Sequence, residues 1–448
     1  MRPDDRVRSA ESDDDRAPDA GNRSAPSSPA KPSSPAKPSS SAKPSSPAWS
    51  TAPARRAPGG AVTTASDAGE GDDPIPVAVP ADELVEIAAR ILGTAGTPEP
   101  TARAVATSLV ESDLVGHDSH GVRRLVPYLD AVRSGTIDPS AEPVLRHRHR
   151  ATAVVDGRHG FGQLAAGLAV TEARRLARRH GVGVVTIGNC NHIGRLGEYV
   201  QVLAEADAVG LAFCNIDPTV APYGGRERRL GTNPLAWSAP RAPGRLPVVV
   251  DFATSAIAEG KLALSLARRE RVGTGLLVDA EGRDSTDPGD FYAGGALLPF
   301  GQHKGYGLSV MIEIVGGLLS GAGVSSLPGY DNTNGTVLIA IDIGTFLPVP
   351  DFRARSEEFC RLLGETAPAV DSAPGPEGVL VPGEKEARTR AVRLAEGISL
   401  AASTWRELTE LPGGPTSPVP PPPRRADRAA PSAEEDPDDI AGGPRTPA

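Results

Sequence analysis

Regularly spaced hydrophobic residues are confined to the middle of this 448-residue chain. Leu84, Ile87 and Leu92 fall on one face of a helix predicted over 81–96, and Gly96 ends it. Shorter apolar runs typical of buried strands alternate with amphipathic segments up to about residue 403. The pattern predicts further helices over 98–115, 162–181, 256–270, 304–321, 351–363 and 384–403, and one that begins near 196. It predicts strands over 152–157, 182–188, 209–216, 233–240, 246–253 and 335–343.

Strands and helices interleave here without a strict strand–helix–strand repeat. This order predicts an α/β fold of mixed, α+β-like character rather than an evenly doubly wound sheet. No G-x-G-x-x-G stands between a strand and a helix, and the nearest match, "DGRHGFGQ" at 156–163, has its glycines in another order. A G-x-x-x-x-G-K-[ST] loop is also missing from the sequence. These motifs therefore indicate no familiar nucleotide site.

The two ends of the chain differ in composition from the middle. Residues 1–75 are rich in Ser, Pro, Ala and charge, and contain the imperfect repeat "SSPAKPSSPAKPSSSAKPSSPA". Residues 412–448 have the same character. Such segments bury too little apolar surface to offset the entropy of ordering, so we predict two disordered Pro-rich tails around a folded domain at 76–411.

The net charge and the cysteine content argue against several classes of function. The net charge is −9 and the pI is near 5.5, which argues against a general nucleic-acid binder. No signal-peptide pattern and no apolar run of membrane-spanning length occurs, so we expect a soluble cytoplasmic protein without a membrane segment. Three cysteines without C-x-x-C spacing indicate no disulfide framework, although Cys190 beside His192 leaves a thiol nucleophile open.

The first polar stretch is "GHDSHGVRRLVPYL" at 116–129. If it is helical, His120, Arg124 and Tyr128 share one face, on which an arginine can grip a small carboxylate with two parallel hydrogen bonds. The alternative, equally weighted on spacing alone, is a capping and ion-pair cluster with Asp118 or Ser119 as N-cap. A metal site at this cluster is the weaker hypothesis, because no second group of ligands stands at comparable spacing, and we predict none.

The second polar stretch, "NCNHIGRLGEYV" at 189–200, places His192 between a predicted strand and a predicted helix. Backbone N–H groups and the helix dipole there disfavour the charged imidazole, as suits a group that exchanges protons. His192 also lies four residues before Leu196 and so continues the apolar face of that helix. Periodicity alone slightly favours a buried structural histidine.

The third stretch is "LPFGQHKGYGLSVMIEIVGG" at 298–317. Glycines surround Lys304 in a loop that enters a long apolar helix, so a cation and free amides form a generic anion site. The alternative is a surface lysine near a turn with glycines for close packing. "VVDFATS" adds a strand that ends at Asp251, where active-site carboxylates often stand.

Together these stretches resemble the malate/L-lactate dehydrogenase family of the non-Rossmann type, which includes ureidoglycolate and sulfolactate dehydrogenases and a cyclic-imine reductase. The matching pieces are "GHDSHGVRRLVPYL", "GFGQLAAGLAV", "NCNHIGRLGEYV", "APYGG", "LGTNPLAWSAP", "DFATS", "TDP" and "LLPFGQHKGYGL", in the family's order. The resemblance implies a mixed, largely antiparallel sheet and a homodimer. It also implies oxidation of a small 2-hydroxy acid, or reduction of the 2-oxo acid, with NAD or NADP.

The resemblance also implies roles for individual residues. The family's proton-transfer histidine falls on His192. Its SHG motif falls on Ser119 and His120 as further catalytic residues, and the substrate-binding arginine and tyrosine fall on Arg124 and Tyr128. The implied cofactor-binding residues come from the strand end, the KGYG loop and the loosely matching "PGEKEA": Asp251, Phe252, Ala253, Lys304, Gly305 and Gly383.

The sequence departs from the family at three places. An aromatic residue is common in the family where Ile193 stands, and a small residue where Arg195 stands. The stretch 261–287 lacks the usual Pro and Trp. Two other functions stay open: a cyclic-imine reductase on the same fold, and a non-catalytic scaffold whose Pro-rich arms dock partners.

Overall fold

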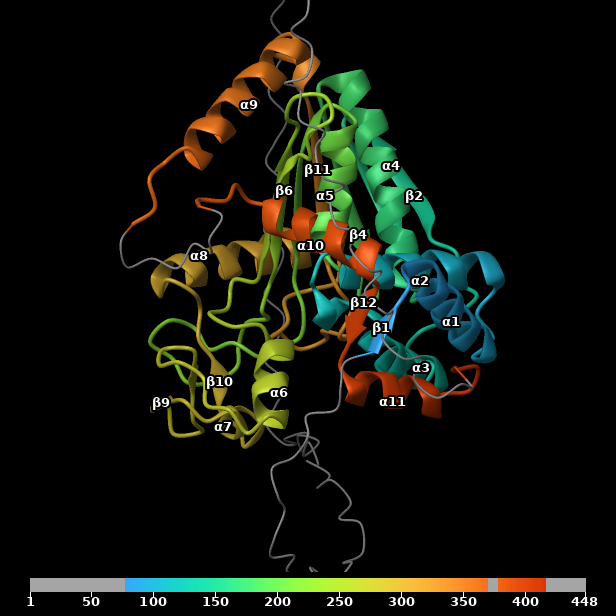
Figure 1. The fold of residues 1–448 in the computed structure, drawn as a ribbon, viewed down its shortest axis with the longest axis vertical. Helices are drawn as coiled ribbons and strands as arrows, with labels where there is room; N and C mark the ends of the chain where they lie inside the picture. The colour runs from blue at the N-terminus through green and yellow to red at the C-terminus, as the bar shows by residue number, and fades with distance from the viewer. Residues whose placement is uncertain (1–76, 370–377, 416–448) are drawn as a thin grey trace, which may run out of the picture. The chain divides into compact units, whose positions relative to one another are not determined.

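The computed structural model describes residues 77–369 and 378–415, so the predicted tails lie almost entirely outside the described residues. Figure 1 shows the arrangement of the elements. The helices are α1 Ala81–Thr94, α2 Glu99–Leu114, α3 Leu125–Arg133, α4 Gly162–His180, α5 Leu196–Glu205, α6 Glu259–Ala267, α7 Pro288–Tyr292, α8 His303–Ile312, α9 Val349–Gly364, α10 Glu384–Glu396 and α11 Ala402–Glu410. The strands are β1 Val77–Val79, β2 Val144–His149, β3 Thr152–Asp156, β4 Val182–Gly188, β5 Ala208–Cys214, β6 Leu235–Ala239, β7 Val248–Phe252, β8 Leu277–Val278, β9 Asp284–Ser285, β10 Ala296–Leu297, β11 Thr336–Asp342 and β12 Ile398–Leu400.

A seven-stranded sheet forms the centre of the fold, in the order β2-β3-β4-β11-β5-β6-β7. Only β3 and β4 run parallel within it, and its other neighbouring pairs are antiparallel. A smaller sheet has the order β10-β8-β9, and β1 pairs with β12. The prediction of a mixed, largely antiparallel, non-Rossmann α/β fold is confirmed.

Helices α4 and α5 cover the same face of the large sheet (Figure 1). Side chains of β5 alternate between buried and half-buried, as a strand with one covered face requires. Glycines let the helices approach closely: a β-carbon on Gly183 would lie 2.1 Å from the carbonyl oxygen of Ala173 in α4. The close approach brings the first turns of α4 and α5 beside the loop that follows β4.

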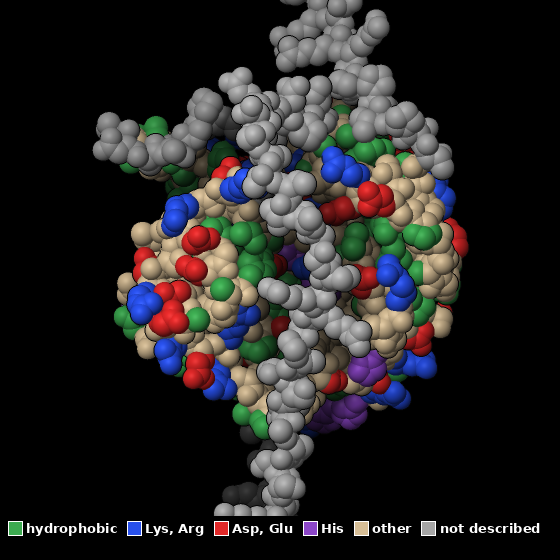
Figure 2. Space-filling view, turned by 90° about the horizontal axis from the view of Figure 1, so that it is seen from below, with side chains coloured by type: hydrophobic (Ala, Val, Ile, Leu, Met, Phe, Trp, Pro, Cys, Tyr) green, Lys and Arg blue, Asp and Glu red, His purple; other side chains and the backbone are tan. Residues whose placement is uncertain are grey.

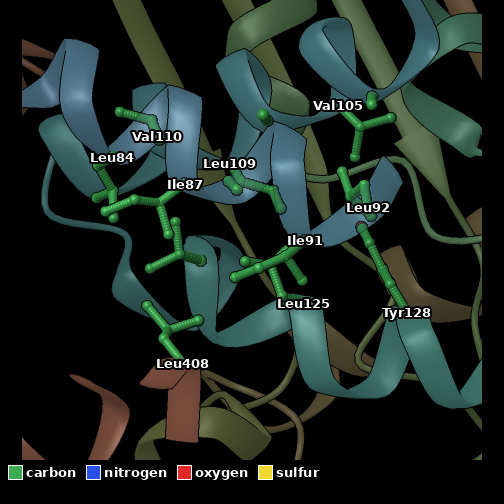
Figure 3. Packing of buried hydrophobic residues seen from close by; sticks show 14 of the residues in the cluster. Leu84, Ile87, Ile91, Leu92, Val105, Leu109, Val110, Leu125, Tyr128 and Leu408 are labelled. Atoms are coloured by element: carbon green, nitrogen blue, oxygen red, sulfur yellow. The ribbon is translucent and has the colours of Figure 1, made fainter. Parts of the chain in front are cut away.

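A second core lies among α1, α2, α3 and α11, beside this sheet. Its leucines and isoleucines are fully buried and interdigitate between the helices (Figure 3). Leu84, Leu109 and Leu125 come from three different helices and meet in this cluster. The second core holds α2 and α3, between which the SHG stretch runs.

The predicted helix over 384–403 is wrong in its second half. Helix α10 ends at Glu396, Gly397 adopts a φ of +88°, and residues 398–400 pair with β1 as a strand. A positive φ suits glycine and stops the helix. The partner strand lies more than three hundred residues earlier, so no local pattern announces the pairing. The helix predicted over 304–321 also changes character, since α8 continues as a π-helical turn over Glu313–Leu318.

Glu313 on that π-helical turn is a buried polar hub. Its Oε1 accepts hydrogen bonds from the backbone N–H of Gly231 (3.2 Å), Asn233 Nδ2 (2.9 Å) and Ser325 Oγ (2.7 Å). Its Oε2 accepts from Asn215 Nδ2 and the backbone N–H of Ser325, both at 3.0 Å. One carboxylate therefore joins α8 to the loops after β5 and before β6.

Replacing Glu313 by alanine leaves these buried donors without an acceptor. Each buried group left unsatisfied costs about 1–3 kcal/mol, so we expect Glu313→Ala to lower the free energy of unfolding by at least about 2 kcal/mol. Urea denaturation measures the change. Glu270→Ala, at an exposed position, is the control and should stay near the wild-type value. Equal stability of the two variants would contradict the role of the hub.

The surface carries charges of both signs. On the face drawn in Figure 2, Lys and Arg side chains are interspersed with Asp and Glu side chains rather than segregated into one large area. Among the described residues, no helix is long and apolar enough to cross a bilayer.

Candidate functional site

The SHG stretch is not one helix, so the condition under which the shared face was expected is not met. Residues 118–120 and 122–124 form two 3₁₀ turns, and α3 begins only at Leu125, with Pro127 in its first turn. Gly121 joins the turns, and a β-carbon there would lie 1.7 Å from Asp113 Oδ1. Asp113 accepts the backbone N–H of Val122 at 2.8 Å, and burial raises the pKa of its carboxyl group to about 8. A buried side chain of α2 therefore fixes the bend.

The loop after β4 is held from three sides. Asn191 Nδ2 donates to the carbonyl oxygens of His159 (2.8 Å) and Gly160 (3.1 Å). Gly162, the first residue of α4, packs so closely that a β-carbon there would lie 2.6 Å from the carbonyl oxygen of His192. Tyr199 Oη donates to the carbonyl oxygen of Ile193. The backbone around His192 is therefore fixed by groups distant from it in sequence.

His192 lies at the meeting point of the SHG stretch and this loop. Its Nδ1 is 2.7 Å from Tyr128 Oη, and its Nε2 is 3.3 Å from Arg124 Nη2. The His120 ring stacks on it with ring centroids 5.4 Å apart and planes 25° apart. His120, Arg124 and Tyr128 thus converge as the shared face predicts, although through two turns and a helix rather than one helix.

The imidazoles of His120 and His192 are held in the neutral form. Burial, the Arg124 cation and His120 place the pKa of His192 well below its ordinary value. Burial and Arg124 lower the pKa of His120 to about 3. Burial raises the pKa of Tyr128 to about 12, so its phenol stays protonated. At neutral pH His192 is thus available to accept a proton.

Arg124 has no acidic partner among the described residues. Its guanidinium reaches only His192 Nε2, and its Nε is buried without a hydrogen-bond partner. A buried guanidinium normally pairs with a carboxylate, because an uncompensated charge is costly to bury. Arg241 illustrates this: its guanidinium binds Glu357 and Glu384. The Arg124 guanidinium is therefore available to bind an anion beside the neutral imidazole of His192.

Ser119 and Asp118 occupy different environments. Ser119 Oγ lies 3.0 Å from His120 Nδ1, and Gly260 in the first turn of α6 packs against Ser119. Asp118 instead pairs with Arg393 of α10 at 2.6 Å and does not cap the turn. The hypothesis that Asp118 is an N-cap is therefore wrong. The packing of Gly260 against Ser119 places α6 at the border of the site.

The strand end at 251–253 and the KGYG loop lie against each other. Phe300 donates its backbone N–H to the carbonyl oxygen of Thr254 at 3.0 Å, and the rings of Phe252 and Phe300 meet edge to face at 5.5 Å. A β-carbon on Gly305 would lie 2.4 Å from the carbonyl oxygen of Phe300, so this position requires glycine. These contacts join two of the three predicted cofactor segments.

The amides of Lys304 and of the two residues after it are not free, which corrects that part of the expected anion site. The backbone N–H groups of Lys304, Gly305 and Tyr306 donate to the carbonyl oxygens of Gly301, Phe300 and Gln302 respectively. The Lys304 side chain itself is exposed. The start of α8 therefore carries a surface cation, and these three amides are not open to an anion.

Asp251 and Gly383 meet at one cavity between the end of β7, the start of α5 and the start of α10. The Asp251 carboxylate accepts the backbone N–H of Gly197 at 2.7 Å, and burial raises the pKa of that carboxyl group. Gly383 adopts a φ of +95° immediately before α10. The cavity is lined by Val115, His117, Arg195, Gln201, Leu246, Pro247, Val249, Asp251, Gly383, Glu386, Ala387 and Arg390.

Cys190 and His117 are the candidates for thiol and metal chemistry. Cys190 is fully buried, and burial raises the pKa of its thiol, which makes it a poor nucleophile. His117 Nε2 lies 3.7 Å from Glu386 Oε1 on α10. The ring of His120 instead stacks on His192, so the two histidines have different partners. Within the described residues, no three His, Cys, Asp or Glu side chains are grouped to hold a metal ion.

Sequence reasoning gave no role to Gln163. Its Nε2 donates to Tyr128 Oη at 2.8 Å, so the line His192–Tyr128–Gln163 runs into the first turn of α4. The signal was present in "GFGQ", a polar residue at the start of an apolar helix face, but its partner is 35 residues away.

The chain is similar to known proteins over most of its described length. The malate/L-lactate dehydrogenase family model matches residues 79–409. Malate dehydrogenase of Pyrococcus abyssi is 36% identical over 346 residues, which cover 75% of this chain and 94% of that protein. L-sulfolactate dehydrogenase of Methanothermobacter thermautotrophicus is 37% identical over 325 residues, 71% of this chain and 92% of that protein. The structure of Δ1-piperideine-2-carboxylate reductase from Pseudomonas syringae pvar. tomato matches with a TM-score of 0.67 and 34% identity, over 75% of this chain and 99% of that one.

Proposed function

Because this chain belongs to the malate/L-lactate dehydrogenase family and is an oxidoreductase, we propose that it interconverts a small 2-hydroxy acid and its 2-oxo acid with NAD or NADP. The observation that carries the proposal is the unpaired Arg124 guanidinium beside the neutral imidazole of His192. A carboxylate bound by Arg124 places its neighbouring carbon and oxygen next to that imidazole. The catalytic domain is proposed to span 76–411.

In this mechanism Arg124 holds the substrate carboxylate and His192 exchanges the proton of the reacting oxygen. Nε2 faces the Arg124 guanidinium, which only donates, whereas Nδ1 faces Tyr128 Oη and, at 3.3 Å, the backbone N–H of Gly194. We assign the lone pair to Nε2 and the hydrogen to Nδ1, because a hydrogen on Nε2 would oppose the guanidinium; the Gly194 N–H then makes no hydrogen bond to Nδ1. Tyr128 Oη, 2.7 Å away, accepts that hydrogen and fixes the ring. During oxidation the hydroxyl proton passes to Nε2. During reduction it returns from Nε2 to the oxygen. His120 and Ser119 orient that oxygen.

Residues of three segments are proposed to hold the nicotinamide cofactor, which supplies or accepts the hydride when bound. Support comes from the cavity that Asp251 and Gly383 share, and from the packing of the strand end on the KGYG loop. The Lys304 cation suits a phosphate group. The proposed set is Asp251, Phe252, Ala253, Lys304, Gly305 and Gly383.

A second enzyme function is favoured by one comparison. The similarity to the Δ1-piperideine-2-carboxylate reductase structure supports reduction of a cyclic imino acid, in which His192 protonates nitrogen. The Arg124 site serves either substrate, since both carry a carboxylate. The scaffold hypothesis has no comparable support, because its Pro-rich arms lie outside the described residues.

We also propose a homodimer. Exposed hydrophobic side chains form a stripe along α8 and the following turn, at Met311, Ile314 and Leu318. Leu211 and Trp237 are neighbours in the sheet register, and Trp237 is exposed. Contiguous exposed apolar surface of this kind is typical of an interface between subunits. Sedimentation velocity on the full chain measures the oligomeric state.

A substrate panel tests the function. We expect oxidation of NADH or NADPH with 2-oxo acids, read at the absorbance of the reduced nicotinamide, and the reverse reaction with the matching 2-hydroxy acids. The panel includes oxaloacetate, pyruvate, 3-sulfopyruvate and Δ1-piperideine-2-carboxylate. Turnover confined to the cyclic imine would favour the second function. Turnover of none of them with either cofactor would overturn the proposal.

A further inference from the structure

Helix α10 is attached to the rest of the molecule by charged side chains rather than by an apolar core. None of its 13 residues is buried. Its first residue, Glu384, accepts a hydrogen bond of 2.9 Å from Arg241 Nη1. Further along, Arg390 donates two hydrogen bonds, of 2.9 and 3.0 Å, to the carboxylate of Glu111 in α2. Elements with few buried apolar contacts have low local stability, so the position of α10 depends on these polar contacts.

The first half of α10 borders the proposed cofactor cavity. Glu386, Ala387 and Arg390 line that cavity together with Gly383, the residue before the helix. The chain at this point is held on the sheet, because the backbone N–H of Val249 in β7 donates to the carbonyl oxygen of Pro382 at 3.2 Å. A ligand in the cavity therefore adds contacts to a helix that has few of its own.

The second half of α10 holds the 3₁₀ turn Asp118–His120 of the SHG stretch. Arg393 Nη1 donates to Asp118 Oδ1 at 2.6 Å, and also to the carbonyl oxygen of Asp113 at the end of α2. Asp118 is followed directly by Ser119 and His120, which are proposed to orient the reacting oxygen of the substrate. Arg393 therefore fixes the start of the turn that carries both residues, without belonging to that turn.

We propose that Arg393 is a positioning residue for the substrate site: it holds the turn Asp118–His120 on α10, so that a cofactor in the neighbouring cavity strengthens binding of the acid. Cofactor contacts restrict α10, and the loss of conformational entropy then no longer accompanies binding of the acid. By linkage, the acid strengthens cofactor binding by the same factor. The inference rests on the proposed function, which places the cofactor in this cavity and the acid beside Ser119 and His120.

The test measures this coupling at equilibrium on the full-length enzyme. NADH and NADPH are titrated by fluorescence, with and without the reduced product of the best substrate in the panel, for example L-malate if oxaloacetate is turned over. No hydride transfer occurs in this complex, because both ligands are already reduced. Coupling between two sites is typically roughly 5- to 150-fold, so we expect the acid to lower the Kd of the reduced cofactor by a factor in this range.

Replacing Arg393 by methionine should lower this factor towards one. The Kd of the cofactor alone should stay unchanged, because Arg241 still holds the start of α10 through Glu384. The value of kcat/KM for the 2-oxo acid should fall roughly 3- to 30-fold, as expected for a lost, partly exposed charged contact. Arg393→Lys keeps the cation and should recover part of the coupling. Asp118→Asn breaks the same ion pair from its exposed end and should lower the coupling even if Arg393→Met does not fold.

Arg353 of α9 offers a matched control. Its Nη2 lies 2.6 Å from Asp207 Oδ1, and its side chain is 23% exposed, against 19% for Arg393. Neither Arg353 nor Asp207 lines the cavity. Arg353→Met should therefore lower thermal stability about as much as Arg393→Met does, and leave the coupling factor and kcat/KM unchanged.

Three results would overturn the inference: no coupling in the wild-type enzyme, a folded Arg393→Met protein with the wild-type factor, or an equal loss of coupling in Arg353→Met. A wild-type enzyme that binds neither reduced cofactor, or that turns over no acid of the panel, would instead remove the proposed function, and this inference with it.

Discussion

Replacing His192 by asparagine is expected to lower kcat roughly 10²- to 10⁴-fold, the range that general acid–base catalysis contributes. Asparagine is close in size and can bond to Tyr128 Oη, so the loop after β4 keeps its shape. Asparagine cannot accept and return a proton at neutral pH. Steady-state kinetics in both directions measure the loss, which should fall mainly on kcat because substrate binding rests on Arg124.

The control for this variant is His147→Asn, on an exposed position of β2. It should match the wild-type enzyme in kcat, KM and thermal stability. Both variants should bind NADH or NADPH with unchanged affinity in a fluorescence titration. A folded His192→Asn protein that keeps wild-type turnover would refute the assigned role of the histidine.

Replacing Arg124 by methionine is expected to lower activity about as strongly, but by weakening substrate binding rather than by slowing the proton transfer. Truncating one member of a buried charge pair costs about 2–5 kcal/mol, so kcat/KM should fall roughly 30- to 4,000-fold. The guanidinium also depresses the pKa of His192. Its loss should therefore move the acidic limb of the kcat/KM–pH profile for oxidation to higher pH.

Arg124→Lys distinguishes charge from geometry. Lysine restores the cation without the planar fork, so it should recover the position of the acidic limb more fully than it recovers KM. Arg123→Met is the charge control at an exposed neighbour and should leave both unchanged. If Arg124→Met raises KM less than about threefold, the carboxylate is held elsewhere.

The spacing of apolar residues and glycines along the sequence predicted the helices and strands that depend on residues close together in the chain. The helices at α1, α2 and α4 and the strands of the large sheet other than β2 follow from apolar spacing and glycine stops, as at Gly181 after α4. The pairing of β1 with β12 was missed because each is three residues long and its partner is remote in sequence. The residue that divides the predicted last long helix, Gly397, is visible in the sequence, but only the remote partner makes residues 398–400 a strand.

The site was predicted less well from spacing than from the set of motifs. Periodicity placed His192 with the core, because it continues the apolar face of α5, whereas the structure surrounds it with a guanidinium, a phenol and a second imidazole. The contribution of Gln163 depends on contacts between distant segments. Such contacts produce no periodic pattern in the sequence.

The central claim is that a neutral His192, held below its ordinary pKa by burial and Arg124, exchanges the substrate proton. The most direct measurement is the pH dependence of kcat/KM for 2-hydroxy acid oxidation, which reports the ionisation of the free enzyme. Oxidation requires the unprotonated imidazole, and a lowered pKa keeps it unprotonated in more acidic solution. The wild-type profile should therefore stay flat down to about pH 6.5, the ordinary histidine value, with its acidic limb below that pH, and His192→Asn should lack this limb. A limb at or above the ordinary histidine pKa, or the same limb in His192→Asn, would contradict the claim.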